Sequence, residues 1–256
     1  MLRSRTCALL GAAAVMSAPL LLGAGTATAE QHDSQTFQAS LQPLNNSGAS
    51  GTMTITLDGN EATVSQNVSG LAATFQNGPY PHVQHIHING QGQCPTAEAD
   101  ANGDGVVNTA EGKPSYGGIG TTFTTSGDTS PDSATDIDRA PSGGNYTYNR
   151  TFTLSEESAQ QVRENNAVIV VHGLDPSTLP EPAASAQSEL VPSLPLAATS
   201  PALCAPLTAV PSGGAAAGAG GTAEMQQHPW LLTAGGMALL TAAGAVVARR
   251  HARTHQ

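Results

Sequence analysis

Basic residues are scarce in this sequence. Among 256 residues there are nine Lys or Arg against 19 Asp or Glu. All the acidic residues lie between Glu30 and Glu224, where the only basic residues are Lys113, Arg139, Arg150 and Arg163, so this part has a net charge near −15. A surface of this sign repels nucleic acid and anionic lipid, which excludes nucleic-acid binding, and it suits cations.

Long hydrophobic runs are missing except at the two ends of the chain. At the start, Arg3 and Arg5 precede an uncharged, Ala- and Leu-rich run from Cys7 to Gly23. Residues 27–29, Ala-Thr-Ala, match the small-residue rule for a cleavage site. We therefore expect residues 1–29 to be a secretory signal peptide.

The other end predicts a membrane anchor. Residues 229–248 carry no charge and are long enough to cross a hydrocarbon core of ~30 Å. Residues 249–256 form a basic tail, and positive charge beside a span stays cytoplasmic. We expect a secreted domain held outside the cell membrane, with a cytoplasmic C-terminus. The alternatives are a buried core helix and a sorting signal that is cleaved and joined to the cell wall.

Cysteine is also rare, with three in the chain. Cys7 is lost with the signal peptide, which leaves Cys94 and Cys204. In an oxidising exterior an even pair is most simply a disulfide. The bond would close a loop from residue 94 to residue 204, and a loop of this length contributes about 4–5 kcal/mol in the chain-entropy model.

Between the two ends the signals are mostly β. Segments rich in β-branched and aromatic residues, several with period-two alternation, occupy 36–41, 52–57, 62–68, 82–88, 146–154 and 167–171. The tripeptide Asp-Gly-Asn at 58–60 predicts a hairpin, and Ser155 before two glutamates predicts the N-cap of a short helix ending near Asn165. Short strands with turns favour a sandwich or barrel, which we expect at residues 30–180.

Two segments lack a strand pattern. The polar stretch between His87 and Tyr146 is long, and loops of that length are functional or disordered. Residues 181–228 are rich in Pro, Ala, Ser and Gly. Apart from the segment that holds Cys204, this composition predicts a flexible stalk.

Residues 100–111, DANGDGVVNTAE, match the calcium-loop pattern D-x-[DN]-x-[DN]-G-x₅-E. Ca²⁺ takes about six to eight oxygens, and this spacing offers them from Asp100, Asn102, Asp104, the carbonyl of Val106, Asn108 and Glu111. Gly112, Pro114, Gly117 and Gly118 follow and should break an exiting helix. We therefore expect an isolated loop with a structural Ca²⁺. The alternative is an acidic turn without an ion.

Three of the eight histidines lie in PHVQHIHINGQGQC, residues 81–94. On a strand, residues two apart share a side, so His85 and His87 align while His82 and Gln84 point away. Two imidazoles make half a site for copper or zinc, which favour this ligand. His172, at a strand end, is the third candidate, although a lone histidine there is more often structural.

The order of GASGTMTITL, VSGL, HVQHIHINGQGQC, GKPSYGG, NAVIVVHG and ALC resembles that of the landmarks in copper/zinc superoxide dismutase. It is also similar to the CHRD domains of bacterial surface proteins. The resemblance covers residues 36–206 and implies a Greek-key β-sandwich or barrel. It further implies copper at His85, His87 and His172, and a disulfide between Cys94 and Cys204.

The chain departs from the dismutases in two places. No histidine lies between His87 and His172, where they have the bridging and remaining zinc ligands, and Pro201 stands at the position of their guiding arginine. With the acidic charge, this favours a non-enzymatic, membrane-tethered metal-binding surface protein. The alternatives are a copper-only dismutase, with His82 as a fourth ligand, and an adhesive or cell-wall module with structural histidines.

Overall fold

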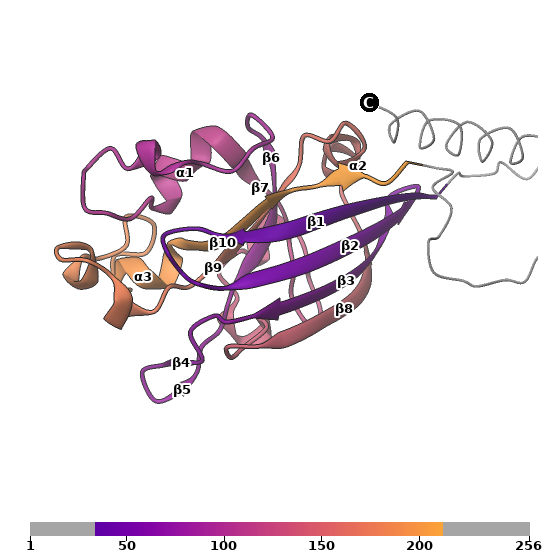
Figure 1. The fold of residues 1–256 in the computed structure, drawn as a ribbon. Helices are drawn as coiled ribbons and strands as arrows, with labels where there is room; N and C mark the ends of the chain where they lie inside the picture. The colour runs from indigo at the N-terminus through magenta and orange to yellow at the C-terminus, as the bar shows by residue number, and fades with distance from the viewer. Residues whose placement is uncertain (1–33, 212–256) are drawn as a thin grey trace, which may run out of the picture. The chain divides into compact units, whose positions relative to one another are not determined.

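The computed structural model describes residues 34–211, which form a curled antiparallel sheet with few helices (Figure 1). The expected signal peptide, membrane span and basic tail lie outside the described residues. Within residues 34–211, no helix has both the length and the apolar character needed to cross a bilayer.

Nine strands form one sheet in the order β7-β6-β9-β10-β1-β2-β3-β8, with β11 paired to β1. Their bounds are β1 Gln35–Pro43, β2 Ser50–Asp58, β3 Glu61–Ser69, β6 Gln84–Asn89, β7 Gly117–Thr122, β8 Tyr146–Thr153, β9 Val168–His172, β10 Pro201–Pro206 and β11 Thr208–Ala209. A two-stranded ribbon of β4 (Thr74–Phe75) and β5 (Gly78–Pro79) stands apart from the sheet. The helices are α1 (Thr109–Tyr116), α2 (Glu156–Arg163) and α3 (Leu196–Thr199), with short 3₁₀ turns between elements.

Alternation and turn chemistry explain the first strands. In β3 every second side chain is buried, beginning with Ala62, and those between are exposed. The hairpin expected at residues 58–60 is present, because Asp58 pairs with Glu61 and Gly59 takes a positive φ of 53°. Ser155 caps α2 as expected, accepting a hydrogen bond from the Ser158 N–H.

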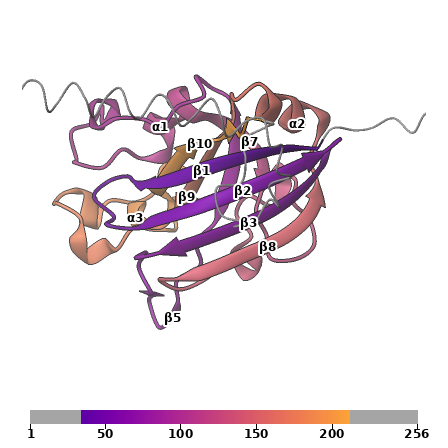
Figure 2. The ribbon, with the colours of Figure 1, turned by 45° about the vertical axis from the view of Figure 1, so that its right-hand side comes forward.

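The sheet curls at β1. This strand pairs with β2 along most of its length but with β10 only at Gln42 and Pro43. The half containing β7, β6, β9 and β10 therefore turns away from the half containing β1, β2, β3 and β8 (Figures 1 and 2). The core fills the curl, and its fully buried members include Phe37, Ile55, Ile86, Ile169 and Leu203.

The other face of β6 and β9 is buried as well. Ile86 and Ile169 face the core, whereas Val168 and Val170 belong to a second apolar cluster with Tyr116 and Cys204. Burial on both faces explains why β9 is an unbroken apolar run that ends in a histidine.

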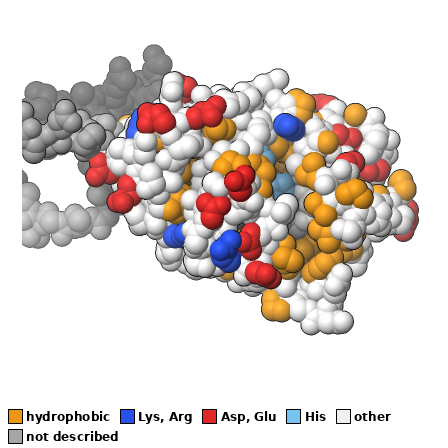
Figure 3. Space-filling view, turned by 180° about the vertical axis from the view of Figure 1, so that it is seen from behind, with side chains coloured by type: hydrophobic (Ala, Val, Ile, Leu, Met, Phe, Trp, Pro, Cys, Tyr) orange, Lys and Arg blue, Asp and Glu red, His pale blue; other side chains and the backbone are white. Residues whose placement is uncertain are grey.

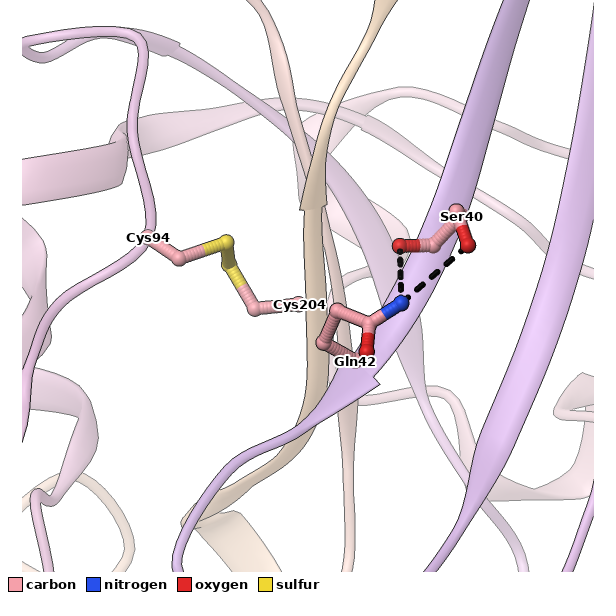
Figure 4. Close-up of a disulfide and its surroundings, with 4 residues drawn as sticks. All are labelled: Ser40, Gln42, Cys94 and Cys204. Carbon is pink, nitrogen blue, oxygen red and sulfur yellow. Dashed lines mark hydrogen bonds between the residues drawn. A yellow bond between two sulfur atoms is a disulfide. The ribbon is translucent and has the colours of Figure 1, made fainter. Parts of the chain in front are cut away.

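The disulfide implied by the dismutase resemblance is present. Cys94 and Cys204 are bonded, with Cα atoms 5.9 Å apart and a separation of 110 positions in the sequence (Figure 4). The bond ties the segment that precedes residues 100–111 to β10.

The stalk expected from residue 181 is wrong for residues 181–211. This segment contains α3, β10 and β11, and β10 pairs with β9 over most of its length. Leu196, Leu203 and Leu207 are at most 1% exposed, so burial overrides a composition typical of linkers.

The expectation that no helix follows residues 100–111 is also wrong. Helix α1 begins at Thr109 with a capping box, in which Asn108 and Glu111 each bond the other's backbone N–H. The missing Cβ of Gly112 leaves room for the Tyr116 ring, since a Cβ there would lie 2.5 Å from it. A capping box at its start and packing of Tyr116 over Gly112 near its end therefore hold a short helix that contains Gly112 and Pro114.

Candidate metal centre

Strand pairing brings His85, His87 and His172 together, and we refer to them as the histidine cluster. His85 lies opposite Val170 in the β6–β9 ladder, and the His172 N–H donates to the Val83 carbonyl. The three imidazoles therefore share one face of the sheet, with ring centroids 5.2 Å apart for His85 and His172 and 5.6 Å for His85 and His87. Each is at most 4% exposed.

One nitrogen of each ring in the cluster is held by a backbone carbonyl. His85 Nε2 bonds the Ala134 oxygen at 3.0 Å, His87 Nδ1 the Gly117 oxygen at 3.1 Å and His172 Nδ1 the Thr199 oxygen at 2.7 Å. A carbonyl can only accept, so each of these nitrogens carries the proton. The other nitrogen of each neutral ring then presents a lone pair.

Those lone pairs have no partner. His85 Nδ1, His87 Nε2 and His172 Nε2 are all buried and lack a hydrogen bond. One ligand nitrogen from each ring lies within 4.8 Å of the others, and among the described residues no other group of three or more His, Cys, Asp or Glu converges in this way. Buried polar atoms are rarely left unpaired, so this set fits a bound cation.

The spacing is compatible with a metal site after a small adjustment. At the limit of 4.8 Å between nitrogens, an ion equidistant from all three would lie about 2.8 Å from each, whereas a metal–imidazole bond is about 2.0–2.1 Å long. Inward movement of at most about 0.7 Å per ring therefore closes the site. Three neutral nitrogen donors suit copper, zinc and similar transition metals better than Ca²⁺ or Mg²⁺.

Burial keeps the cluster neutral and ready to bind a metal. It lowers the pKa of His87 to about 3 and that of His172 to about 4. Burial also lowers the pKa of His85 well below its usual value, and the neighbouring His172 and His87 lower it further. Hydrogen bonds to the carbonyls oppose these shifts but do not outweigh them.

His82 and Gln84 point away from the cluster, as the alternation predicts. Both ring nitrogens of His82 already face carbonyl oxygens, those of His172 and Ala72, each at 2.9 Å. The His82 nitrogens therefore face these carbonyls and not the cluster, which removes His82 as a fourth ligand. The Gln84 side chain is fully buried, with its amide oxygen 3.4 Å from the Tyr146 hydroxyl.

The cluster lies close to one side of the molecule. Figure 3 shows histidine atoms at the floor of a hollow flanked by hydrophobic side chains. Lys113, the only lysine of the chain, is exposed and near enough to contribute to lowering the pKa of His87. Pro201 pairs directly with His172 across β9 and β10, so the residue at that position borders the cluster.

Residues 100–111, which we call the acidic loop, have a different arrangement. The Asp100 carboxylate accepts the N–H groups of Gly103 and Gly105, both at 2.8 Å. The Asp104 carboxylate accepts the N–H of Val106 at 2.9 Å. The loop therefore folds around its own carboxylates, and these do not converge as the histidines do.

Glu111 closes the acidic loop and starts α1. One carboxylate oxygen accepts the N–H groups of Ala101 and Asn102, and the other accepts the N–H of Asn108. The Asn108 amide donates to Glu189 at 2.7 Å. The six predicted calcium ligands thus lie in one closed loop, and calcium binding there stays a prediction.

Sequence reasoning missed the groups that orient the histidines, because they are backbone carbonyls of Gly117, Ala134 and Thr199 and carry no residue-type signal. It also missed α1, although Asn108 and Glu111 stand at the spacing of a capping box. Neither protein-family models nor the curated proteins contain a match to this chain.

Proposed function

We propose that this chain is a membrane-tethered, extracellular metal-binding surface protein that holds a transition metal, copper in the first instance, at the histidine cluster. One observation carries the proposal: three buried imidazoles offer ligand nitrogens within 4.8 Å of one another, and each ring keeps one unpaired nitrogen while a carbonyl fixes the other. Hydrogen bonds of this kind orient metal-bound histidines and raise their basicity. When bound, copper would supply a redox-capable Lewis acid.

We further propose that the domain is a Greek-key sandwich of the dismutase or CHRD type. The positions of the cluster on β6 and β9 and of the disulfide support this. So does the meeting of β10 with β1, which joins the two halves of the sheet.

The surroundings of the cluster favour binding without dismutase catalysis. Superoxide is an anion, and the described residues carry 16 acidic side chains against four basic ones. Pro201, uncharged, borders His172 at the position where the dismutases carry a cation. An acidic surface slows the approach of an anion and favours that of a metal cation.

Copper uptake by the purified full chain tests the proposal. Wild type should bind one Cu(II) per chain, and His85→Asn combined with His172→Asn should abolish stoichiometric uptake. His82→Asn is the matched control: both nitrogens of that ring face backbone carbonyls and not the cluster, so uptake should persist. Equal uptake by wild type and the double variant would refute the site, whereas dismutase activity of the copper-loaded chain would favour the copper-only enzyme.

We also propose a structural Ca²⁺ in the acidic loop. The loop holds its six candidate ligands, five side chains and the Val106 carbonyl, in one closed turn, and a carboxylate oxygen retains lone pairs beyond those used by backbone N–H groups. Calcium should raise the melting temperature of wild type. Asp100→Asn with Glu111→Gln, which keeps an acceptor at each position, should remove that rise. No calcium-dependent rise in wild type would refute the assignment.

The expected anchoring is tested separately. Removal of residues 229–256 should release the protein from the membrane fraction into the medium. Retention of the shortened chain with the cells would contradict the proposed anchor.

A further inference from the structure

Helix α1 is linked to the histidine cluster at both of its ends, through a shared carbonyl at the first and by direct packing at the last. Its first residue, Thr109, donates from its hydroxyl to the Thr199 carbonyl at 2.6 Å. The same carbonyl oxygen accepts His172 Nδ1 at 2.7 Å. Two donors on one oxygen use both of its lone pairs and fix its direction, so Thr109 helps set the orientation of the His172 ring.

The last residue of α1 packs on a second ligand. The Tyr116 ring lies 4.5 Å from that of His87 at an interplanar angle of 63°, and it is fully buried. Its hydroxyl donates to the Thr109 carbonyl at 2.9 Å. The next residue, Gly117, provides the carbonyl that holds His87 Nδ1.

These contacts form a continuous path from His172 to His87. Thr109 connects to His172 through the Thr199 carbonyl, and Tyr116 connects Thr109 to His87. The ligand nitrogens of the cluster reach bonding distance after an inward movement of at most about 0.7 Å per ring. The hydrogen bond on the other nitrogen of each ring therefore affects how easily the ring can move to bind an ion.

We propose that Thr109 and Tyr116 are positioning residues of the histidine cluster, which set its affinity for a transition metal without touching the ion. The expected effect on metal affinity rests on the proposed function, whereas the expected effect on ring orientation does not. Because the capping box places Glu111 of the acidic loop at the start of α1, the helix also joins the two candidate metal sites physically.

The first measurement is Cu(II) affinity of the full chain by competition with a chelator of known affinity. Thr109→Val removes the hydroxyl at nearly constant shape and should weaken binding by about 10–100-fold, the usual range for groups that orient metal ligands. Tyr116→Phe, which keeps the ring and loses the hydroxyl, should weaken binding less. Thr109→Ser, which restores the hydroxyl, should recover most of the affinity.

Ser158→Ala is the matched control. The Ser158 hydroxyl is buried and donates to the Gly120 carbonyl at 3.1 Å, beside the Ile88 side chain, which belongs to the main apolar core and not to the cluster. Its loss should reduce stability but leave Cu(II) affinity at the wild-type value. Equal affinity losses in Thr109→Val and Ser158→Ala would overturn the positioning role, because general loosening of the fold would then explain both.

The second measurement needs no metal. In the metal-free chain, the His172 Nδ1–H should give a slowly exchanging imidazole resonance in nitrogen–proton NMR spectra, because it is buried and bonded. Thr109→Val should shift it and speed its exchange, while Ser158→Ala should not. An unchanged resonance in Thr109→Val overturns the inference. A changed resonance in a chain that takes up no copper would support the positioning role while refuting the proposed function.

Discussion

The histidine cluster and the acidic loop both present metal-type ligands, but they differ in what those ligands already bond. In the cluster one nitrogen of each ring is tied to a carbonyl and the other is unpaired. In the acidic loop the carboxylates of Asp100, Asp104 and Glu111 accept N–H groups of the loop itself. The cluster therefore keeps open acceptors, whereas the loop satisfies its own.

The difference separates two ways of building a cation site. Unpaired buried acceptors cost free energy, so an ion at the cluster would relieve a cost that the folded chain already bears. The acidic loop is closed without an ion, and a cation there would add to bonds already made. We expect stability to depend on conditions much more at the cluster than at the loop.

The largest expected effect is that acid destabilises the fold through the histidine cluster. As the pH falls below about 6.5, ordinary imidazoles in the unfolded chain take up protons, whereas His87 and His172 in the fold do not until about pH 3 and 4. Protonation thus favours the unfolded state in this window. With three such rings, the free energy of unfolding should fall by up to about 6 kcal/mol between pH 7.5 and 5.

Urea unfolding of the metal-free chain at the two pH values measures this loss. His85→Asn with His172→Asn removes two of the three cluster rings and should remove about two thirds of the cluster's part of the pH dependence. His82, whose pKa is also lowered by burial, keeps its own contribution. The same slope in wild type and double variant would place the acid sensitivity elsewhere and break the comparison.

Loss of the disulfide should have the next largest effect. Cys94→Ser with Cys204→Ser should lower the free energy of unfolding by about 2–5 kcal/mol, because the bond closes a long loop. The bond holds the chain just before the acidic loop, so loop amides should lose hydrogen-exchange protection before those of β6 and β9. An equal loss of hydrogen-exchange protection in the acidic loop and in β6 and β9 would show that the loop is no less stable than these strands.

Metal binding tests the two regions directly. At a free Zn(II) concentration about 100 times its Kd, the cluster should gain about 2.7 kcal/mol, seen as a rise in melting temperature. The rise should survive Asp100→Asn with Glu111→Gln and disappear in the histidine double variant. A Zn(II) effect that follows the loop variant would reverse the assignment of the two regions.

The smallest expected effect is at an unpaired polar group that belongs to neither candidate metal site. Gln66 is fully buried in β3, and neither atom of its amide has a partner. Because the amide is a single mixed donor and acceptor, we expect only a penalty, and Gln66→Leu should raise the free energy of unfolding by about 1 kcal/mol. The exposed Gln38→Leu should change it little. A loss of Zn(II) binding in Gln66→Leu would contradict this distinction.

Sequence patterns predicted the strands that alternate, such as β2, β3 and β6, and the shared side of His85 and His87. They failed for β7 and β10, whose Gly-rich and Pro/Ala-rich sequences have low β propensity and whose strand state depends on pairing with β6 and β9. His172 became a ligand candidate of weight only through the dismutase resemblance. Its partner, the Thr199 carbonyl, depends on a fold that sequence alone did not specify.

The position of Thr199 has a consequence for biosynthesis. His85 and His172 are 87 residues apart in the sequence, and the group that orients His172 follows 27 residues later. Until residue 199 has been made, the His172 ring lacks the carbonyl that fixes its Nδ1. If the cluster binds a metal as proposed, a chain stopped before residue 199 should bind it more weakly than the full chain.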